Sequence, residues 1–369
     1  MPNEIQGVSY RREGSGKDLS YGKIRMVFPA RNQSLQLAND EVAKWFTAYH
    51  PNRLGDNYGK GDHFAGKDVD FVWEYDGSAD YFVLEIAEEG DFADCLCFRS
   101  ESNNVKVGDL NTFTDYSWRV RAFKDGEKVA EGESCFHTEK SPRTISVDGV
   151  SNARDIAFFS KKLKQGMIYR SASLDAVTEK GLIDALSKYG IRTEIDLRNT
   201  GEGKQRPLGE TVNYYSFPGS YYVITAASIK DPLYQENMAE AMKIFADESK
   251  YPIVFHCAIG RDRTGTFAAV LESFLGADYE DIMADYEMSF FSDAGCKDES
   301  TPDVMFTRIT EIYDFLSAYG KGSLRENTEK FLRDIGVSAE DLKSIQRIMA
   351  KPEKKTEKKT RGDEIKRSN

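Results

Sequence analysis

The spacing of hydrophobic residues divides the chain into two regions. Between about residues 20 and 138, short runs of β-branched and aromatic residues alternate with polar positions and are separated by Gly, Asp and Asn turns. This period of two, with a turn every 8–12 residues or so, is typical of an all-β sandwich. The predicted strands are VDFVWEY (69–75), DYFVLEIA (80–87), NVKVGDL (104–110), YSWRVRAF (116–123) and ESCFHT (133–138).

Beyond residue 143 the pattern changes to strands that alternate with helices. Short apolar runs predict strands at 166–172, 191–197, 212–217 and 252–257, and a 3.6-residue apolar repeat predicts helices at 178–190 and 236–250. Helices then dominate, at 264–276, 279–291, 303–320, 328–336 and 338–350. This alternation predicts an α/β domain with a mostly parallel sheet flanked by helices.

The two periods also predict the domain organisation. Residues 67–140 form the sandwich and residues 143–350 the α/β domain. The segment 1–66 is partly strand and partly helix, with NDEVAKWFTAYH (39–50) as its helix, and is either part of the sandwich or a short preceding segment. The tail 351–369 has eight basic, four acidic and one apolar residue, so it is predicted to be disordered.

Composition narrows the class of protein. Of 369 residues, 40% are hydrophobic and 30% charged, as in soluble globular proteins. No run approaches the ~18 apolar residues of a membrane span. The net charge of −11, from 50 basic and 61 acidic residues, argues against a nucleic-acid partner. No signal peptide is visible in the polar start MPNEIQGVSYRREGSG. By default this predicts a cytoplasmic protein. If a signal peptide was trimmed before this start, the protein is secreted.

The five cysteines are too few and too irregularly spaced for a disulfide framework or a zinc site, so no metal is expected. One cysteine, Cys257, stands in HCAIGRDRTG (256–265), between the apolar strand PIVF and the helix TGTFAAVLESFLG. A loop between the carboxyl end of a strand and the amino end of a helix is where open α/β sheets bind ligands, and where backbone N–H groups bind anions. The alternative is a charged turn without chemistry.

The spacing within this loop suits a phosphate group. Arg263 lies six positions after Cys257, which leaves five residues to curl their amides around one tetrahedral anion. The guanidinium of Arg263 offers a fork that matches two phosphate oxygens. The helix dipole and Arg263 both favour a thiolate at Cys257, which could attack a bound phosphorus. Six positions after each other cysteine there is no arginine.

The remaining loop residues have supporting parts in this interpretation. The phosphate-binding loop comprises Ala258, Ile259, Gly260, Arg261 and Thr264. Gly260 allows a close approach of the backbone, Thr264 can donate a hydrogen bond to the cysteine sulfur, and His256 orients the loop. A nucleotide-binding loop GxxxxGK[ST] is nearly matched at 260–266, but Thr266 stands in place of its lysine.

HCAIGRDRTG resembles the signature HCxxGxxRTG of the cysteine-dependent phosphatase superfamily. The domain 143–350 is similar to the atypical bacterial tyrosine/lipid phosphatase family, on the elements SNARDI (151–156), IYRSAS (168–173), EIDLRN (194–199) and GRDR (260–263). The resemblance implies a metal-independent phosphatase with a phosphocysteine intermediate and no cofactor. The stretch 67–140 likewise resembles a fibronectin type III domain, with Trp73, Leu110, Tyr116 and WRVRA in the order expected there.

Differences from the family's pattern affect the predicted substrate, and the identity of the general acid is open. Arg261 replaces the usual lysine, and Ala258 stands where phosphoinositide-selective relatives often have a lysine. The resemblance suggests Asp262 as the general acid, whereas other tyrosine phosphatases use an upstream aspartate, here Asp231 in SIKDPLY. Four further residues either line the pocket or form a buried ion-pair network: Arg154, Asp155, Asp196 and Arg198.

The sequence therefore predicts a phosphomonoester hydrolase of the protein-tyrosine-phosphatase type, acting on phosphotyrosyl proteins. One alternative is a phosphatase of phosphoinositides or inositol phosphates. Others are a rhodanese-like sulfurtransferase, and a catalytically silent binding protein whose fibronectin-like domain binds a protein or carbohydrate partner.

Overall fold

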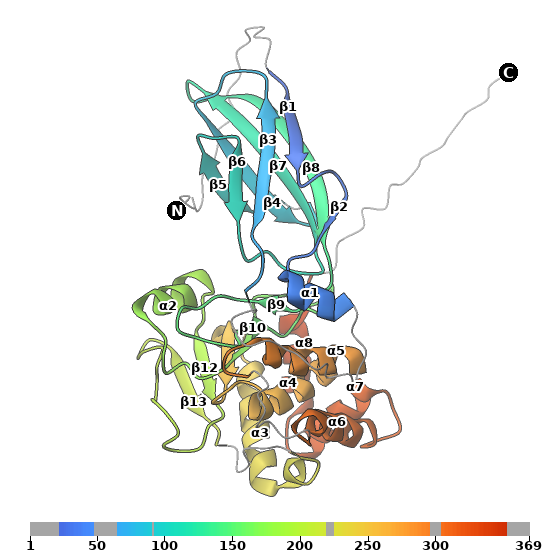
Figure 1. The fold of residues 1–369 in the computed structure, drawn as a ribbon. Coiled ribbons are helices and arrows are strands. Elements are labelled where there is room, and N and C mark those ends of the chain that lie inside the picture. Colours follow the sequence, from blue (N-terminus) through green and yellow to red (C-terminus); the bar gives the residue numbers. More distant parts are fainter. Residues whose placement is uncertain (1–21, 48–64, 91, 219–224, 296–303, 353–369) are drawn as a thin grey trace, which may run out of the picture.

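The computed structural model describes residues 22–47, 65–90, 92–218, 225–295 and 304–352, with the backbone alone for 304–308. An elongated β-sandwich stands on a broader α/β domain (Figure 1). No helix in the described ranges has the length and apolar character needed to cross a bilayer. Cys296 and the tail from residue 353 onward lie outside these ranges.

The sandwich consists of two sheets. The smaller has the order β1–β3–β6, from the antiparallel strands β1 (Ile24–Phe28), β3 (Val69–Tyr75) and β6 (Asn104–Val107). The larger has the order β2–β8–β7–β4–β5, from β2 (Gln33–Leu35), β8 (Glu127–Thr138), β7 (Asp115–Lys124), β4 (Tyr81–Glu88) and β5 (Leu96–Ser100). Among the described residues of the segment 1–66, β1 and β2 thus form part of the sandwich.

The alternation read from the sequence creates the sandwich core. In β3 and β7 every second side chain points inward, and Phe71 of β3 meets Trp118 of β7 with ring centroids 5.2 Å apart. Next to this core, the hydroxyl of Tyr116 accepts a hydrogen bond of 2.8 Å from the backbone N–H of Asn111, five residues upstream. Such a tyrosine corner is a feature of immunoglobulin-like sandwiches. The all-β architecture is compatible with the fibronectin type III assignment, which stays a prediction.

The α/β domain is built on a six-stranded sheet of order β13–β12–β14–β11–β10–β9. Four of its strands are parallel: β13 (Asn213–Ser216), β12 (Thr193–Asp196), β14 (Ile253–His256) and β11 (Ile168–Ser171). The short strands β10 (Arg154–Asp155) and β9 (Arg143–Thr144) add an antiparallel edge. The predicted mostly parallel sheet flanked by helices is confirmed.

Helices cover both faces of this sheet. Phe255 of the central strand β14 packs into the larger core cluster, and its neighbour Val254 packs into the cluster on the opposite face, beneath α2 (Glu179–Ile183). The helix predicted at 178–190 is regular only to Ile183, after which the turn widens into a π-helix at Asp184–Lys188. The other helices are α3 (Pro232–Phe245), α4 (Asp262–Leu275), α5 (Tyr279–Met288), α6 (Val304–Ser317), α7 (Leu324–Asp334) and α8 (Ala339–Met349).

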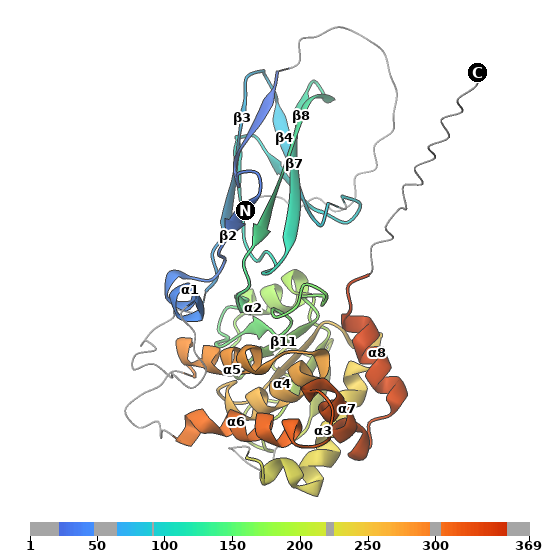
Figure 2. The same ribbon diagram turned by 90° about the vertical axis from the view of Figure 1, so that its right-hand side faces the viewer.

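One more helix, α1 (Asp40–Thr47), lies between β2 and β3 in the chain but packs against the α/β domain (Figure 2). Acidic residues occupy its first turn and Val42 and Trp45 its buried face, as expected for a short amphipathic helix. The predicted helix at 39–50 is confirmed over its described part.

Candidate active site

The loop 257–261 lies at the carboxyl edge of the parallel sheet. In the register of the strands, His256 of β14 is level with Ser171 of β11 on one side and Asp196 of β12 on the other. The three strands therefore end together, and the loop leads directly into the first turn of α4. Cys257 begins the loop and is only 2% exposed.

The carbonyl groups of the loop are held from outside. The backbone N–H of Ser173 donates to the carbonyl of Ala258 at 2.9 Å, and the side-chain amide of Asn152 donates to that of Ile259 at 2.9 Å. The guanidinium of Arg170 donates to the carbonyl of Gly260 at 2.6 Å. Since the N–H of a peptide group points opposite to its C=O, the N–H groups of the three following residues turn toward the inside of the loop. This arrangement is that of an anion-binding nest at a helix N-terminus.

Gly260 makes this path possible. Its φ of +72° lies in the left-handed region, and a Cβ placed there would come within 2.5 Å of the carbonyl oxygen of Ser171. A side chain at this position would push the loop away from the end of β11. The sequence-based expectation of a close backbone approach at Gly260 matches this geometry.

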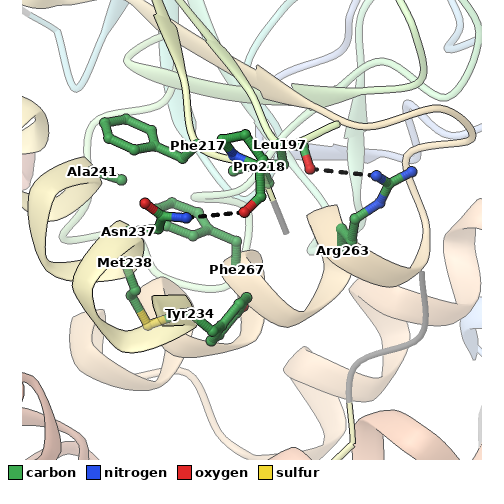
Figure 3. Close-up of a pocket in the computed structure, with 9 residues that line it drawn as sticks. All are labelled: Leu197, Phe217, Pro218, Tyr234, Asn237, Met238, Ala241, Arg263 and Phe267. Atoms are coloured by element: carbon green, nitrogen blue, oxygen red, sulfur yellow. Dashed lines mark hydrogen bonds between the residues drawn. The ribbon is translucent and has the colours of Figure 1, made fainter. Parts of the chain in front are cut away.

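Arg263 lies in the first turn of α4 with its side chain only 4% exposed. Its Nη1 donates to a carboxylate oxygen of Glu202 at 2.8 Å. The same Nη1 donates, more weakly, to the carbonyl of Leu197 at 3.5 Å (Figure 3). Glu202 therefore orients the guanidinium. A small, mainly apolar pocket adjoins Arg263, lined by Leu197, Phe217, Pro218, Tyr234, Asn237, Met238, Ala241 and Phe267.

Asp262, the acid suggested by the family, is the first residue of α4. One of its carboxylate oxygens accepts a hydrogen bond of 2.9 Å from the hydroxyl of Tyr286 and one of 3.3 Å from Nε of Arg261. Burial, together with the charge of Asp262, raises the pKa of Tyr286 well above its usual value, so this hydroxyl stays protonated and keeps donating. A Cβ on Gly265 would lie 2.7 Å from the Tyr286 ring, so the glycine of the Arg-Thr-Gly motif makes room for that ring.

Asp231, the alternative acid, is the N-cap of α3. Its carboxylate accepts hydrogen bonds from the backbone N–H groups of Leu233 at 3.0 Å and Tyr234 at 3.1 Å. The described contacts of Asp231 are those of a residue that begins a helix.

The guanidinium of Arg261 pairs with the neighbouring Asp262 and also contacts the segment that follows α5. It lies 5.3 Å above the ring of Phe290 and donates to the carbonyl of Gly295 at 3.2 Å. Arg261 keeps the positive charge of the family's lysine, with Asp262, Phe290 and Gly295 among its contacts.

A buried ion network stands behind the loop. The carboxylate of Asp285, on α5, binds Nε of Arg154 at 2.7 Å and forms a close ion pair with Arg170. Arg154 in turn hydrogen-bonds the side chain of Asn152. Burial alone would raise the pKa of Asp285, but the charges of the two arginines hold it below its usual value. The anionic Asp285 thus orders both side chains that hold the carbonyls of Ile259 and Gly260.

His256 has a similar supporting place. Its Nε2 lies 3.1 Å from a carboxylate oxygen of Glu194, and its Nδ1 lies 3.3 Å from the carbonyl oxygen of Cys257. The side chains of His256 and Glu194 are fully buried. These contacts suit a residue that orients the start of the loop.

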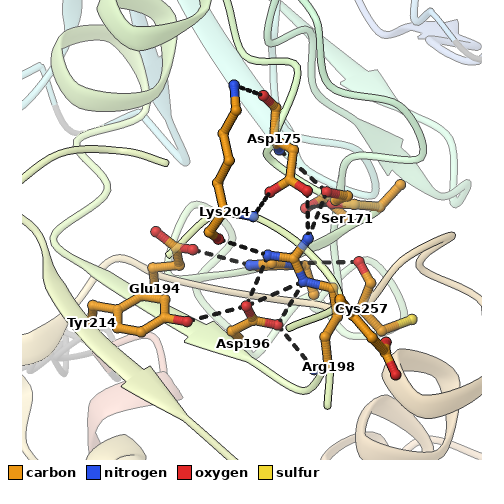
Figure 4. Close-up of polar contacts among 12 residues, drawn as sticks. Ser171, Asp175, Glu194, Asp196, Arg198, Lys204, Tyr214 and Cys257 are labelled. Atoms are coloured by element: carbon orange, nitrogen blue, oxygen red, sulfur yellow. Dashed lines mark hydrogen bonds and ion pairs between the residues drawn. The ribbon is translucent and has the colours of Figure 1, made fainter. Parts of the chain in front are cut away.

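The other predicted pocket residues are engaged in buried ion pairs. Arg198, 2% exposed, donates to Asp196, Asp175, Ser173 and the carbonyl of Lys204 (Figure 4). Burial would raise the pKa of Asp196, but its hydrogen bonds with Arg198 hold that pKa below the usual value. Asp155 pairs with Arg143 at 3.1 Å. The structure thus places Arg154, Asp155, Asp196 and Arg198 in separate buried ion pairs, in line with the alternative that the sequence offered to a pocket role.

Sequence reasoning missed several residues that support the loop, among them Asn152, Arg170, Glu202, Asp285 and Tyr286. The first two stand inside the quoted elements SNARDI and IYRSAS, so the motifs did carry a signal. The other three follow no spacing rule relative to Cys257.

Among the described residues, one cluster has the donor atoms of a metal site: Glu85, Cys95 and Cys97, on the sandwich. The Glu85 carboxylate is already paired with Arg119 and with Arg121, the latter at 3.2 Å. These two cations already balance the charge of the carboxylate in this cluster.

Comparison with known proteins agrees with this geometry. The model of a family described as the tyrosine phosphatase family matches residues 145–351, more than half of the chain. A curated protein of Cupriavidus necator, provisionally named a tyrosine-protein phosphatase, is 24% identical across an alignment of 172 residues. That alignment covers 38% of this chain and 61% of the relative, so the chain spans less than two thirds of the relative's length.

Solved structures show weaker likeness. The core catalytic domain of the PP-IP phosphatase SIW14 of S. cerevisiae is 15% identical, with a TM-score of 0.32, over 51% of this chain and 94% of the other. TpbA of P. aeruginosa is 17% identical with the same TM-score and the same two coverages. The assignment therefore rests on the family match, which includes the whole loop from Cys257 to Arg263. The chain belongs to the tyrosine phosphatase family.

Proposed function

We propose that this protein hydrolyses phosphomonoesters through a phosphocysteine intermediate and acts first on phosphotyrosine in proteins. The observation that carries the proposal is the loop of Cys257, whose carbonyls are tied outward by Ser173, Asn152 and Arg170. Its N–H groups are left to bind the oxygens of a phosphoryl group above the thiol.

In this mechanism the sulfur of Cys257 attacks phosphorus as the bond from phosphorus to the ester oxygen breaks. Cys257 stands five residues before α4, at whose amino end the helix dipole favours an anion. Arg263, oriented by Glu202, binds two of the three terminal phosphoryl oxygens, and the loop N–H groups bind the third. Thr264 supports the second step, because its buried hydroxyl has no hydrogen-bond partner among the described residues and can donate to the leaving sulfur.

Asp262 supplies the proton. As the ester bond breaks, its carboxyl donates to the leaving oxygen, and the resulting carboxylate then takes a proton from the water that attacks phosphocysteine. The sulfur leaves, and inorganic phosphate is released. The hydrogen bonds from Tyr286 and Arg261 hold the carboxyl group of Asp262 at the start of α4.

The choice of acid can be tested by leaving-group dependence. With phenyl phosphate, whose phenolate leaves poorly, Asp262→Asn should lower kcat by about 10²-fold, because the leaving oxygen must depart without a proton. The loss should be smaller with p-nitrophenyl phosphate, whose phenolate is stable on its own.

Asp231→Asn is the matched control, since asparagine is as good an N-cap as aspartate and α3 should remain intact. It should leave both rates near those of the parent. The opposite pattern, a leaving-group-dependent loss in Asp231→Asn alone, would transfer the role to Asp231.

The charges around the loop favour phosphotyrosine over phosphoinositides as the substrate. Ala258, directly after the nucleophile, is exposed and uncharged, and the cation of Arg261 is turned toward Phe290. Neither residue offers the loop a cation for a second phosphate group.

A substrate panel tests this proposal. In the presence of a chelator, the full chain should hydrolyse phosphotyrosyl peptides at higher kcat/KM than phosphoseryl peptides, phosphoinositides or inositol phosphates. Highest activity on a phosphoinositide or an inositol phosphate would replace the substrate class. Turnover that requires added metal, or formation of thiocyanate from thiosulfate and cyanide in place of phosphatase activity, would overturn the mechanism.

We also propose that the N-terminal sandwich is a fibronectin type III-like module. The three-stranded sheet facing a larger one, and the Tyr116 corner, support this assignment. Its protein or carbohydrate partner stays a prediction.

A further inference from the structure

Helix α1 buries its apolar face on α5. Val42 and Trp45 of α1 form one core cluster with Ala284 and Met288 of α5 and with Phe291 just beyond it. Trp45 is 8% exposed, and its ring centroid lies 5.1 Å from that of Phe291. Figures 1 and 2 both show α1 beside α5, below the sandwich strands to which it is joined.

The next residues along α5 reach the catalytic loop. Ala284 and Met288 are four positions apart and share the side that faces α1. Asp285 instead binds the two arginines that order the donors to Ile259 and Gly260, and Tyr286 binds Asp262. Helix α5 therefore packs against α1 through Ala284 and Met288, and through Asp285 and Tyr286 it contacts residues that hold or adjoin the loop.

A second contact from the N-terminal side reaches the same helix. Lys140, in the segment that joins β8 to β9, forms an ion pair of 2.5 Å with Asp281 in the first turn of α5. The segment after α5 also bears on the loop, because the carbonyl of Gly295 accepts from Arg261, the neighbour of Asp262.

We propose that α1 is a positioning element of the catalytic loop: by fixing α5 it fixes Asp285 and Tyr286, and through them the loop carbonyls and Asp262. This inference rests on the proposed phosphatase function. It makes Trp45 a positioning residue, although it lies more than two hundred residues before Cys257 in the chain. The N-terminal region then contributes to catalysis in addition to any binding role.

The expected size of the effect follows from the tolerance of active-site geometry. A displacement of about 1 Å in a reacting group can cost roughly 10²-fold in rate. Trp45→Ala leaves a cavity against Phe291 and Met288 into which α5 can shift. The shift would loosen Asp285 and Tyr286 together. The residues that touch the substrate would all still be present, but less well positioned.

The test compares Trp45→Ala with Trp45→Phe and Lys44→Ala in the full chain, with p-nitrophenyl phosphate as substrate. Lys44 is the exposed neighbour of Trp45 on the same helix and serves as the control. We expect Trp45→Ala to lower kcat about 10- to 100-fold with a smaller change in KM, Trp45→Phe to recover most of it, and Lys44→Ala to match the parent. A folded Trp45→Ala with kcat within twofold of the parent would overturn the proposal.

Two further measurements separate this proposal from loss of folding and from failure of the proposed function. If Trp45→Ala does not fold, Met288→Ala trims the same contact from the α5 side and should give the same selective loss in kcat. If the parent has no phosphatase activity, hydrogen exchange still tests whether α1 positions the loop. Residues 257–263 should then exchange faster in Trp45→Ala than in the parent and Lys44→Ala. Unchanged protection of the loop would contradict the coupling whatever the activity.

Discussion

Replacing Cys257 by serine should lower the turnover of p-nitrophenyl phosphate by at least about 10⁴-fold, because the covalent step loses its nucleophile. A serine hydroxyl has nearly the size of the thiol, so the buried side chain should leave the loop folded. The hydroxyl does not ionise under the conditions that favour the thiolate, and the neighbouring Arg263 cannot compensate for that. The rates are measured for both proteins with a chelator present.

The matched control for this substitution is Cys135→Ser. Cys135 is a half-buried thiol of β8 whose sulfur lies 3.1 Å from the side-chain oxygen of Asn32, on the sandwich. Its replacement should leave turnover unchanged. Equal turnover by the parent and Cys257→Ser would show that the reaction uses another group.

Replacing Arg263 by lysine should lower kcat by about 10²–10³-fold, even though the charge is kept. Lysine presents one ammonium group in place of a planar fork, so it cannot bind two oxygens of the transferring phosphoryl group at once. It also cannot reproduce the geometry in which Glu202 and the carbonyl of Leu197 hold the guanidinium. The loss should appear in kcat and in the affinity for the transition-state mimic orthovanadate.

Arg206→Lys provides the control, since Arg206 is exposed and should tolerate the change. Full activity in Arg263→Lys would mean that charge alone suffices at this position. The bidentate contact would then have no part in catalysis.

The strands and helices with strong periodicity were predictable from sequence. The strand at Val69–Tyr75 has the predicted bounds, and α4 begins within two residues of the prediction. Strand was predicted within the segment 1–66, but without the bounds of β1 and β2, and the strands β5, β9 and β10 were not predicted. The three residues of β2, for example, form a strand because they pair in parallel with the end of β8, a contact made across about a hundred residues of sequence.

The sequence also contains local signals for the start of a helix that the prediction did not use. Helix α3 begins at Pro232, four residues before the predicted start, because Asp231 caps it and proline fits its first turn. The same N-cap geometry bears on the choice of acid. The sequence alone left Asp231 and Asp262 as alternatives, and the carboxylate of Asp231 binds the amides that open α3.

The catalytic loop was predictable because its chemistry is local. A cysteine, an arginine six positions later and a strand-to-helix junction stand within one short segment. Its support is not local: Asp285 and Tyr286 reach the loop from α5, and Glu202 from the turn after β12. Such partners are chosen by packing, and their spacing in the chain carries no rule that a single sequence could reveal.

The central claim is that Cys257 carries the phosphoryl group during turnover. Its most direct test is rapid acid quench of the parent with p-nitrophenyl phosphate, followed by mass spectrometry of the peptide that contains Cys257. The account predicts a mass gain of one phosphoryl group on Cys257, absent in Cys257→Ser. Turnover with an unmodified Cys257, or a phosphoryl group found on another residue in both proteins, would contradict it.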